Sequence, residues 1–334
     1  MMNEGLVTTI IPVWNRPREL AEAVQSVLDQ DWRPIEIVIV DDGSTDETLD
    51  AARAIEARHP GIVRVLTQSH AGPGAAREAG RSAATGEYIQ YLDSDDVLLP
   101  GKFSAQVAAL RKNPDCGVAY GLDRSVTHDG QIIVSPQMEA MVHSRPEAIF
   151  PAFLADRLWG TATPLYRRSV CDRAGPWLNT SIDEDYEYEC RIGSFGTRLA
   201  FVDQYVCEFR DSQTGRLSYR RLDPALLSQR AQCWGLVLQH ARRAGIENSA
   251  PEMRHFARKL FRWSRFCAAA GLVTQSKLLF ELTRDASGQD RKAYLTAYRL
   301  ASSVLGWTRV AKLIERNAVR RCLVQLRLVR TAAS

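Results

Sequence analysis

Strand-like and helix-like segments alternate along the first hundred residues, and this alternation restricts the chain to few folds. Buried strands are indicated by short β-branched or apolar runs at residues 7–13, 35–40, 62–66 and 88–92. Between them, apolar spacing and capping residues predict helices at residues 19–28, about 45–58 and 75–84. Strands joined by single helices form right-handed βαβ units, so we expect an α/β fold built on a mainly parallel sheet.

The rest of the chain is expected to complete this domain and to add a helical region. Further elements are predicted as a helix at 101–112, strands at 116–120 and 131–134 around a hairpin at 128–130, and a last strand at 205–210. Beyond Arg220 the pattern is helical. We therefore expect an α/β domain over residues 1–220, with two halves that meet near residue 115, and a C-terminal helical region over 221–334.

Composition places the chain among globular proteins. Charged residues make up 25% of the 334 residues and mean hydropathy is −0.23, which argues against disorder. No uncharged apolar stretch approaches the roughly 18–20 residues of a membrane-spanning helix. The N-terminus runs directly into a strand-like segment without the basic and apolar regions of an export signal, which predicts a cytoplasmic protein.

The cysteines and histidines argue against disulfides and zinc. Seven cysteines lie far apart without CxxC spacing, which is typical of reduced, mostly buried thiols. The six histidines are equally scattered, so neither residue type forms a zinc-binding pattern.

Charge is distributed unevenly along the sequence. The net charge of +4 combines 22 basic and 32 acidic residues before Arg221 with 21 basic and 7 acidic residues from Arg221 onward. The acidic half is expected to hold any metal chemistry, and the basic half to meet an anionic partner.

Three carboxylates follow the predicted strand at 88–92 abruptly: Asp93, Asp95 and Asp96. At the carboxyl end of a strand in an open α/β sheet, such residues are placed where ligands bind. Close carboxylates repel unless a cation neutralises them, and oxygen ligands with substrate phosphates suit Mg²⁺ or Mn²⁺. A helix N-terminus with acidic first-turn residues is the competing interpretation, and this stretch alone does not separate the two.

A glycine-bearing loop at residues 72–74 superficially resembles part of a dinucleotide-binding fingerprint. The match fails because Arg77 stands where the third glycine belongs and because the loop follows the third strand rather than the first. The sequence therefore argues against a classical NAD site.

Five short motifs punctuate the acidic half. They are TIIPVWNRP at 9–17, VDDGSTD at 40–46, GPGAAR at 72–77, GEYI with LDSDD at 86–96, and EDY at 184–186. Their order and spacing resemble family 2 glycosyltransferases, the inverting GT-A enzymes that use nucleotide-activated sugars. The resemblance covers about residues 5–220, and it implies a nucleotide-binding half (1–115) and an acceptor half (116–220).

The resemblance assigns nucleotide contacts to six residues. It places Pro12, Val13 and Trp14 near the base, Asp41 at a ring NH of the base, Arg77 close to the nucleotide, and Asp93 at the ribose or the water shell of the metal. Trp14 stands where the family usually has Tyr, so a stacking face is kept and a hydroxyl is lost. A solvated helix position remains the alternative for Arg77.

The same resemblance supplies a metal ligand and a base. Asp95 would bind Mn²⁺ or Mg²⁺ bridging the two phosphates, which assists departure of the nucleoside diphosphate. Asp185 would be the general base that takes the acceptor proton, while Glu184 beside it points to a different face if the segment is helical. Composition alone would favour a solvated helix start for this acidic segment.

Four further residues are weaker candidates for acceptor or phosphate contacts: Trp159, Glu184, Arg210 and Arg216. Many relatives carry a His shortly after the Arg of the last strand, but this chain continues as Asp211–Arg216, so a metal contact from that loop is doubtful. Cys233 also interrupts the QxxRW pattern of processive synthases, which predicts transfer of one sugar per encounter.

The C-terminal region carries a basic stripe. Arg309, Lys312, Arg316, Arg320 and Arg327 would align along one helix beside an apolar face, as in helices that lie on anionic membranes. A solvated face on helices that pack within the protein is an equal alternative. Aromatic residues are not interleaved with the stripe, so nucleic acid is a poorer partner.

These observations predict an inverting, metal-dependent glycosyltransferase that moves a single sugar from a nucleotide-diphosphate donor, a UDP-sugar by family habit, to a hydroxyl of a glycan or lipid-linked acceptor. The expected setting is surface polysaccharide or lipid-linked glycan assembly in the cytoplasm, with peripheral contact to the inner membrane face as one possibility. A non-catalytic nucleotide-sugar-binding protein and, less well, a nucleotidyltransferase remain alternatives. The oligomeric state stays open.

Overall fold

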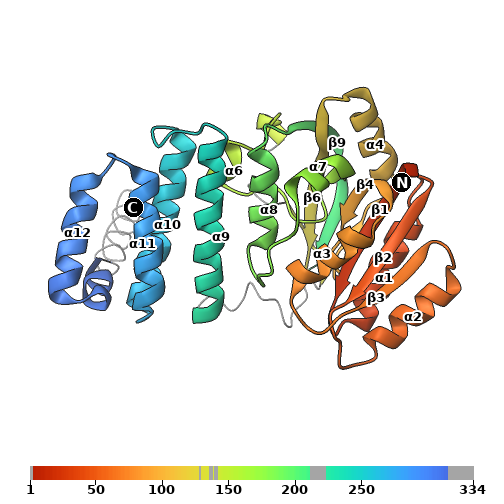
Figure 1. Ribbon diagram of the computed structural model, residues 1–334, viewed down its shortest axis with the longest axis horizontal. Helices are drawn as coiled ribbons and strands as arrows, with labels where there is room; N and C mark the ends of the chain where they lie inside the picture. The colour runs from red at the N-terminus through yellow and green to blue at the C-terminus, as the bar shows by residue number, and fades with distance from the viewer. Residues whose placement is uncertain (1–2, 128, 135–137, 139–141, 211–222, 315–334) are drawn as a thin grey trace, which may run out of the picture. The chain divides into compact units, whose positions relative to one another are not determined.

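The computed structural model describes residues 3–127, 129–134, 138, 142–210 and 223–314. The chain forms two compact units, one of residues 1–220 with 236–245 and one of residues 221–235 with 246–334 (Figure 1). The stretch 236–245 belongs to a helix that begins in the other unit. The first unit therefore covers residues 1–220, the span expected for the α/β domain, and also includes residues 236–245.

Four parallel strands form one side of the sheet in the first unit, as the alternating pattern predicts. Their order is β3-β2-β1-β4, with bounds β1 Asn3–Val13, β2 Ile35–Asp41, β3 Val63–Thr67 and β4 Gly86–Tyr91. The connecting helices are α1 Pro17–Leu28, α2 Thr48–Arg58 and α3 Pro73–Ala83. Helix α1 buries Leu20, Ala23, Val24 and Val27, the apolar positions that predicted it.

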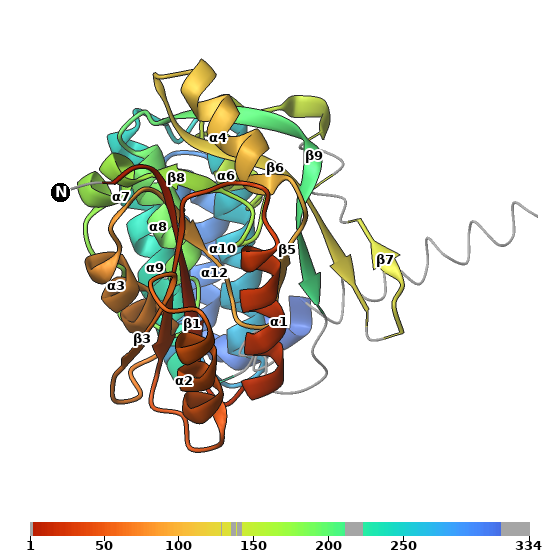
Figure 2. The same cartoon turned by 90° about the vertical axis from the view of Figure 1, so that its right-hand side faces the viewer.

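The other side of the sheet is mixed, with parallel and antiparallel pairs. The order continues β8-β6-β9-β5, with β7 paired to β6 outside this path. The bounds are β5 Val97–Leu98, β6 Cys116–Val126, β7 Ile132–Ile133, β8 Leu165–Arg167 and β9 Arg198–Arg210. Strands β6 and β9 run parallel side by side (Figure 2), whereas β8 is antiparallel to β4 and β6.

The mixed half departs from the sequence pattern because its strands are very short or unexpectedly long. Strands β5 and β8 have two and three residues, too few for a period-two pattern to be recognised. Strands β6 and β9 extend well beyond the predicted 116–120 and 205–210, and the predicted hairpin is confirmed where β7 pairs with β6.

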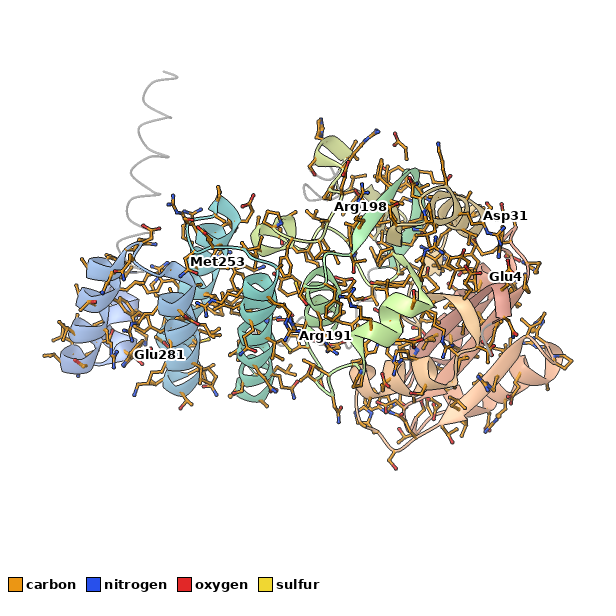
Figure 3. All side chains as sticks on the ribbon, turned by 45° about the horizontal axis from the view of Figure 1, so that its top comes forward. Glu4, Asp31, Arg191, Arg198, Met253 and Glu281 are labelled. Carbon is orange, nitrogen blue, oxygen red and sulfur yellow. The ribbon has the colours of Figure 1, made fainter. Side chains whose placement is uncertain are left out.

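The remaining helices of the first unit surround the mixed half. They are α4 Lys102–Lys112, α6 Ala152–Ala155, α7 Arg168–Ala174 and α8 Glu184–Gly193. Helix α8 starts in the second acidic cluster, and its Arg191, labelled in Figure 3, forms an ion pair with Glu187. Glu187 also lies 2.7 Å from Nε2 of His240, so residues 236–245 are held to this unit by a buried hydrogen bond.

The second unit is helical, as expected beyond residue 220. Its helices are the first part of α9 (Pro224–Arg243), α10 Pro251–Ala269, α11 Val273–Ser287, α12 Lys292–Leu305 and a further helical segment at 307–314. Val310 is buried in their core and Ile314 packs against it, so the apolar face beside the basic stripe is used internally in this segment. Arg316, Arg320 and Arg327 lie outside the described residues.

Among the described residues, no helix combines the length and apolar character that crossing a bilayer requires. The six cysteines within the described part of the chain are reduced and buried, as predicted.

Candidate active site

The carboxyl ends of β1, β2 and β4 lie at one edge of the sheet and assemble the candidate site. The register pairs Val13 with Asp41 and Ile10 with Tyr91, and the ladder continues where the Leu92 amide donates to the Ile10 carbonyl at 3.0 Å. Asp93 and Asp95 therefore emerge beside the end of β1. Parallel strands place ligand-binding residues at this edge because their carboxyl ends coincide there.

Asp41 carries a buried carboxylate oxygen without a hydrogen-bond partner among the described residues. The residue is 2% exposed, its Oδ2 accepts a 3.2 Å bond from the Ser44 amide, and its Oδ1 accepts none. An unsatisfied buried oxygen is costly, which makes it a candidate acceptor for a ligand donor.

Trp14 and the adjacent acidic loop border this position. The Trp14 ring is 47% exposed and lies 4.7 Å from the His70 ring, while Pro12 and Val13 are buried in β1. Asp42, which the sequence analysis left without a role, fixes the glycine loop. Its carboxylate accepts bonds from Gln68 and from the amides of Ala71 and Gly72, and it contacts His70.

Arg77 joins the two acidic motifs. One guanidinium nitrogen donates to Asp93 and another to Glu184, both at 2.6 Å, and the guanidinium lies 5.0 Å from the centre of the Trp177 ring. Arg77 is 3% exposed, so the interpretation as a solvated helix residue is wrong. Burial alone would lower the pKa of Arg77, but Asp93 and Glu184 outweigh it and raise that pKa.

Asp95 is also paired with an arginine. Arg16, at the end of the loop that follows β1, forms an ion pair with the Asp95 carboxylate, and the two side chains are 23% and 12% exposed. Asp96 accepts a 3.2 Å bond from the Arg210 amide, which ties the last residue of the acidic turn to the end of β9.

The donor set of Asp93 and Asp95 fits a divalent cation in chemical type. Both are carboxylates, which Mg²⁺ and Mn²⁺ prefer. In the described part of the chain, no group of three or more metal-ligating side chains is assembled, and Arg77 and Arg16 neutralise these two carboxylates. Phosphate oxygens of a substrate would have to complete the coordination.

Asp185 lies in the first turn of α8 with both carboxylate oxygens engaged. Arg157 donates to Oδ2 at 2.5 Å, the Thr161 hydroxyl donates to the same oxygen at 2.9 Å, and the Tyr186 amide donates to Oδ1 at 2.7 Å. Burial raises the pKa of Asp185, but Arg157 and Arg77 outweigh this effect and hold that pKa below its ordinary value.

Glu184 and Glu189 flank Asp185 with different partners. Burial is the dominant effect on Glu184 and raises its pKa despite the ion pair with Arg77. Glu189 receives two bonds from Arg157, at 2.8 and 2.9 Å, and one from the Trp159 indole at 3.2 Å. Glu184 thus faces the strand-end cluster, and Asp185 faces Arg157, as a helical segment requires.

Two cavities open beside these groups. One of about 440 Å³ is lined by Asp95, Asp96, Glu208 and Arg210 among others. The other, of about 310 Å³, is lined by Asp123, Asp156, Arg157, Trp159, Gly160 and Phe209. Arg157 therefore connects the second cavity to Asp185, and the predicted pocket floor at residues 159–163 contributes Trp159 and Gly160.

The structure thus brings some of the predicted site residues into contact and leaves others apart. Arg77, Asp93 and Glu184 are in direct contact, whereas Arg210 pairs with Glu22 at the wall of the first cavity. Arg216 lies outside the described residues.

Sequence reasoning missed Arg16, Asp42 and Arg157. Arg16 and Asp42 stand within the motifs at 9–17 and 40–46, so their position was a usable signal. Nothing in the local sequence pattern marks Arg157, because its carboxylate partners come from α8, 28 and 32 residues later.

The sheet, its flanking helices and the acidic strand ends define a GT-A fold. Staphylococcus aureus TarS 1–349 in complex with UDP-GlcNAc matches 93% of this chain and 92% of its own, with a TM-score of 0.71 at 17% identity. The Pyrobaculum calidifontis mannosyltransferase PcManGT in complex with GDP-Man and Mn²⁺ matches 94% of this chain and 86% of its own, with a TM-score of 0.53 at 18% identity. At these identities the likeness establishes the fold.

Sequence comparison points to one family within this fold. Residues 8–171 match the family model for glycosyl transferase family 2, which supports membership of that family.

Two curated relatives illustrate the extent of the similarity. An uncharacterized glycosyltransferase of Nostoc sp. is 40% identical over 117 residues, 35% of this chain and 36% of the relative. The succinoglycan biosynthesis protein ExoO of Rhizobium meliloti is 26% identical over 273 residues, 78% of this chain and 74% of the relative. The matches to the first three curated relatives span only 29–45% of those proteins' length.

Proposed function

We propose that this protein is an inverting glycosyltransferase that transfers one sugar from a nucleotide-diphosphate-sugar, a UDP-sugar, to a hydroxyl acceptor. The observation that carries the proposal is Arg77, which bonds Asp93 of the strand-end motif and Glu184 of the EDY motif at 2.6 Å each. This contact brings the strand-end motif and the EDY motif into one cluster, which supports a site that combines donor binding with proton transfer.

The donor nucleotide is proposed to bind at the ends of β1 and β2. The unpartnered Oδ1 of Asp41 accepts a ring NH of the base, and the exposed face of Trp14 beside His70 offers a stacking surface. Pro12 and Val13 form the buried floor, and Asp93 accepts a ribose hydroxyl. TarS and PcManGT were solved with UDP-GlcNAc and GDP-Man, so a nucleotide-sugar donor suits the fold.

Asp95, with Asp93, would hold a divalent cation, Mn²⁺ or Mg²⁺. When bound, such an ion offsets the charge that develops on the departing diphosphate. Mn²⁺ in the PcManGT structure supports this part of the proposal.

Asp185 is proposed as the general base. Arg157 and Arg77 hold its carboxylate ionised, and Arg157 and Thr161 donate to its Oδ2, so it is competent to accept a proton at neutral pH. A lowered pKa makes a carboxylate a weak base, so proton transfer at Asp185 is favoured once the acceptor hydroxyl replaces one of these two donors.

The acceptor is proposed to enter the cavity of about 310 Å³ that Arg157, Trp159 and Gly160 line beside Asp185. The Trp159 indole NH is already bonded to Glu189, so Trp159 contributes a wall rather than a hydrogen bond. Glycan and lipid-linked acceptors in surface polysaccharide assembly fit this proposal, and the similarity to a succinoglycan biosynthesis protein supports the setting. A cytoplasmic location at the inner membrane face belongs to the same proposal.

The test is a panel of UDP- and GDP-sugars with Mn²⁺, with nucleotide release and the anomeric configuration of the product as readouts. We expect product of inverted configuration, loss of donor binding in Asp41→Asn, loss of turnover with retained donor binding in Asp185→Asn, and loss of both in Asp95→Asn. The exposed Asp50→Asn in α2 is the matched control and should behave as wild type. Unchanged turnover in Asp95→Asn and Asp185→Asn would refute the mechanism, and donor binding without turnover would indicate a binding protein.

A further inference from the structure

The proposed function assigns Asp95 to the metal and Asp93 to the ribose, and each of these carboxylates is paired with an arginine. The two arginines differ in exposure and in their number of carboxylate partners. Arg77 has a side chain that is 4% exposed and has a second carboxylate partner, Glu184. Arg16 has a side chain that is 23% exposed, and the ion pair the structure gives it within the described residues is that with Asp95. Arg77 is thus fixed in place, whereas the Arg16 side chain can move away from Asp95.

The backbone that carries Arg16 is anchored. Its amide donates to the Thr48 hydroxyl at 2.8 Å, and the preceding Asn15 amide donates to the Ser44 hydroxyl at 3.0 Å. Any movement of Arg16 is therefore confined to its side chain, which stays within reach of the strand-end edge.

The position of Arg16 suits a diphosphate as its alternative partner. Arg16 stands two residues after Trp14, at the end of the loop that follows β1, and its present partner Asp95 lines the cavity of about 440 Å³. A guanidinium binds two phosphate oxygens at once, and a diphosphate carries more negative charge than one carboxylate. The cavity lining also carries the carboxylates of Glu19, Glu22, Asp96 and Glu208, so a diphosphate would approach it together with its cation. At Asp95 that diphosphate would compete well for Arg16.

We propose that Arg16 competes with a divalent cation for Asp95, and that the diphosphate of the donor removes this competition by binding Arg16 itself. This inference rests on the proposed function and adds that the cation and the nucleotide diphosphate bind cooperatively. The cation binds weakly to the nucleotide-free protein, and its affinity rises when nucleotide diphosphate is present. By linkage, the cation raises nucleotide affinity by the same factor.

The test measures Mn²⁺ binding to the full chain by electron paramagnetic resonance of free Mn²⁺, with and without UDP. Without UDP, Arg16→Gln should bind Mn²⁺ about 5-fold tighter than wild type, because a partly exposed ion pair no longer competes. The gain in Mn²⁺ affinity on adding UDP should shrink in this variant by about the same factor. Arg18→Gln, an exposed arginine two residues away in α1, should match wild type, and Arg16→Lys should retain weak nucleotide-free binding.

Equal or weaker nucleotide-free Mn²⁺ binding in Arg16→Gln would overturn the inference, as would an undiminished gain from UDP. Tighter binding in Arg16→Lys equal to that in Arg16→Gln would also overturn it, because charge would then be irrelevant. These readouts are independent of transfer: the Mn²⁺ result can fail while turnover is intact, and turnover can be absent while the Mn²⁺ result holds.

Discussion

Replacement of Arg77 by methionine is expected to destabilise the first unit strongly, because methionine fills the space but removes a buried charge. The Arg77 and Glu184 side chains are 4% and 6% exposed, so Glu184 would be left buried without its partner. Breaking a buried ion pair by removing one member costs about 3–5 kcal/mol.

The contribution of Asp93 to this loss should be smaller. Its side chain is 32% exposed, and exposed ion pairs contribute about 0–1 kcal/mol because water screens them. Most of the loss should therefore be recovered by Arg77→Met combined with Glu184→Gln, which removes the orphaned charge. The exposed pair Arg53–Glu56 supplies the control: Arg53→Met should cost less than about 1 kcal/mol.

Urea unfolding followed by tryptophan fluorescence measures these differences, since Trp177 lies directly beneath the Arg77 guanidinium. The reasoning would be refuted by a cost below about 1 kcal/mol for Arg77→Met, or by a double variant no more stable than Arg77→Met.

Two other predictions concern the interior. Burial lowers the pKa of Lys102 from 10.5 to about 7, so its contribution to stability is complete above pH 10.5 and is lost as the pH falls toward 7. In denaturation experiments, the stability of Lys102→Met relative to wild type should therefore rise as the pH is lowered from 10 to 7. Gln106 still donates to the Thr163 carbonyl that Lys102 contacts in wild type. A difference in stability that stays constant across this pH range would contradict the argument. In α3, a Cβ on Gly74 would lie 1.9 Å from the Leu178 carbonyl oxygen, so Gly74→Ala should lower the free energy of unfolding in urea by about 1–3 kcal/mol. Gly235→Ala in α9 is the control: its Cβ would make only ordinary contacts, so this change should be neutral or stabilising.

The parallel half of the fold was predictable because each of its elements repeats a clear period. Strands β1 to β4 are continuous apolar runs, and α1 presents its apolar residues every three or four positions. The site edge followed from this, since acidic residues come directly after β2 and β4.

The contacts that tune the site were not predictable, because they join residues far apart in sequence. Arg16 meets Asp95 and Arg157 meets Asp185 only after the sheet has placed β1 beside β4 and α8 beside the loop before β8. A sequence pattern indicates periodic elements and local turns, but it does not indicate which charged residues pair when they are 28 or more residues apart in the chain.

The short hydrogen bond between His240 and Glu187 has a practical consequence for anyone who shortens this chain. A fragment that stops at residue 220 discards residues 236–245 and leaves Glu187, 1% exposed, without one of its hydrogen-bond partners. Glu187 belongs to the same helix as Asp185, so such a fragment would loosen the helix that carries the proposed base. An expression fragment should therefore end after Gly245.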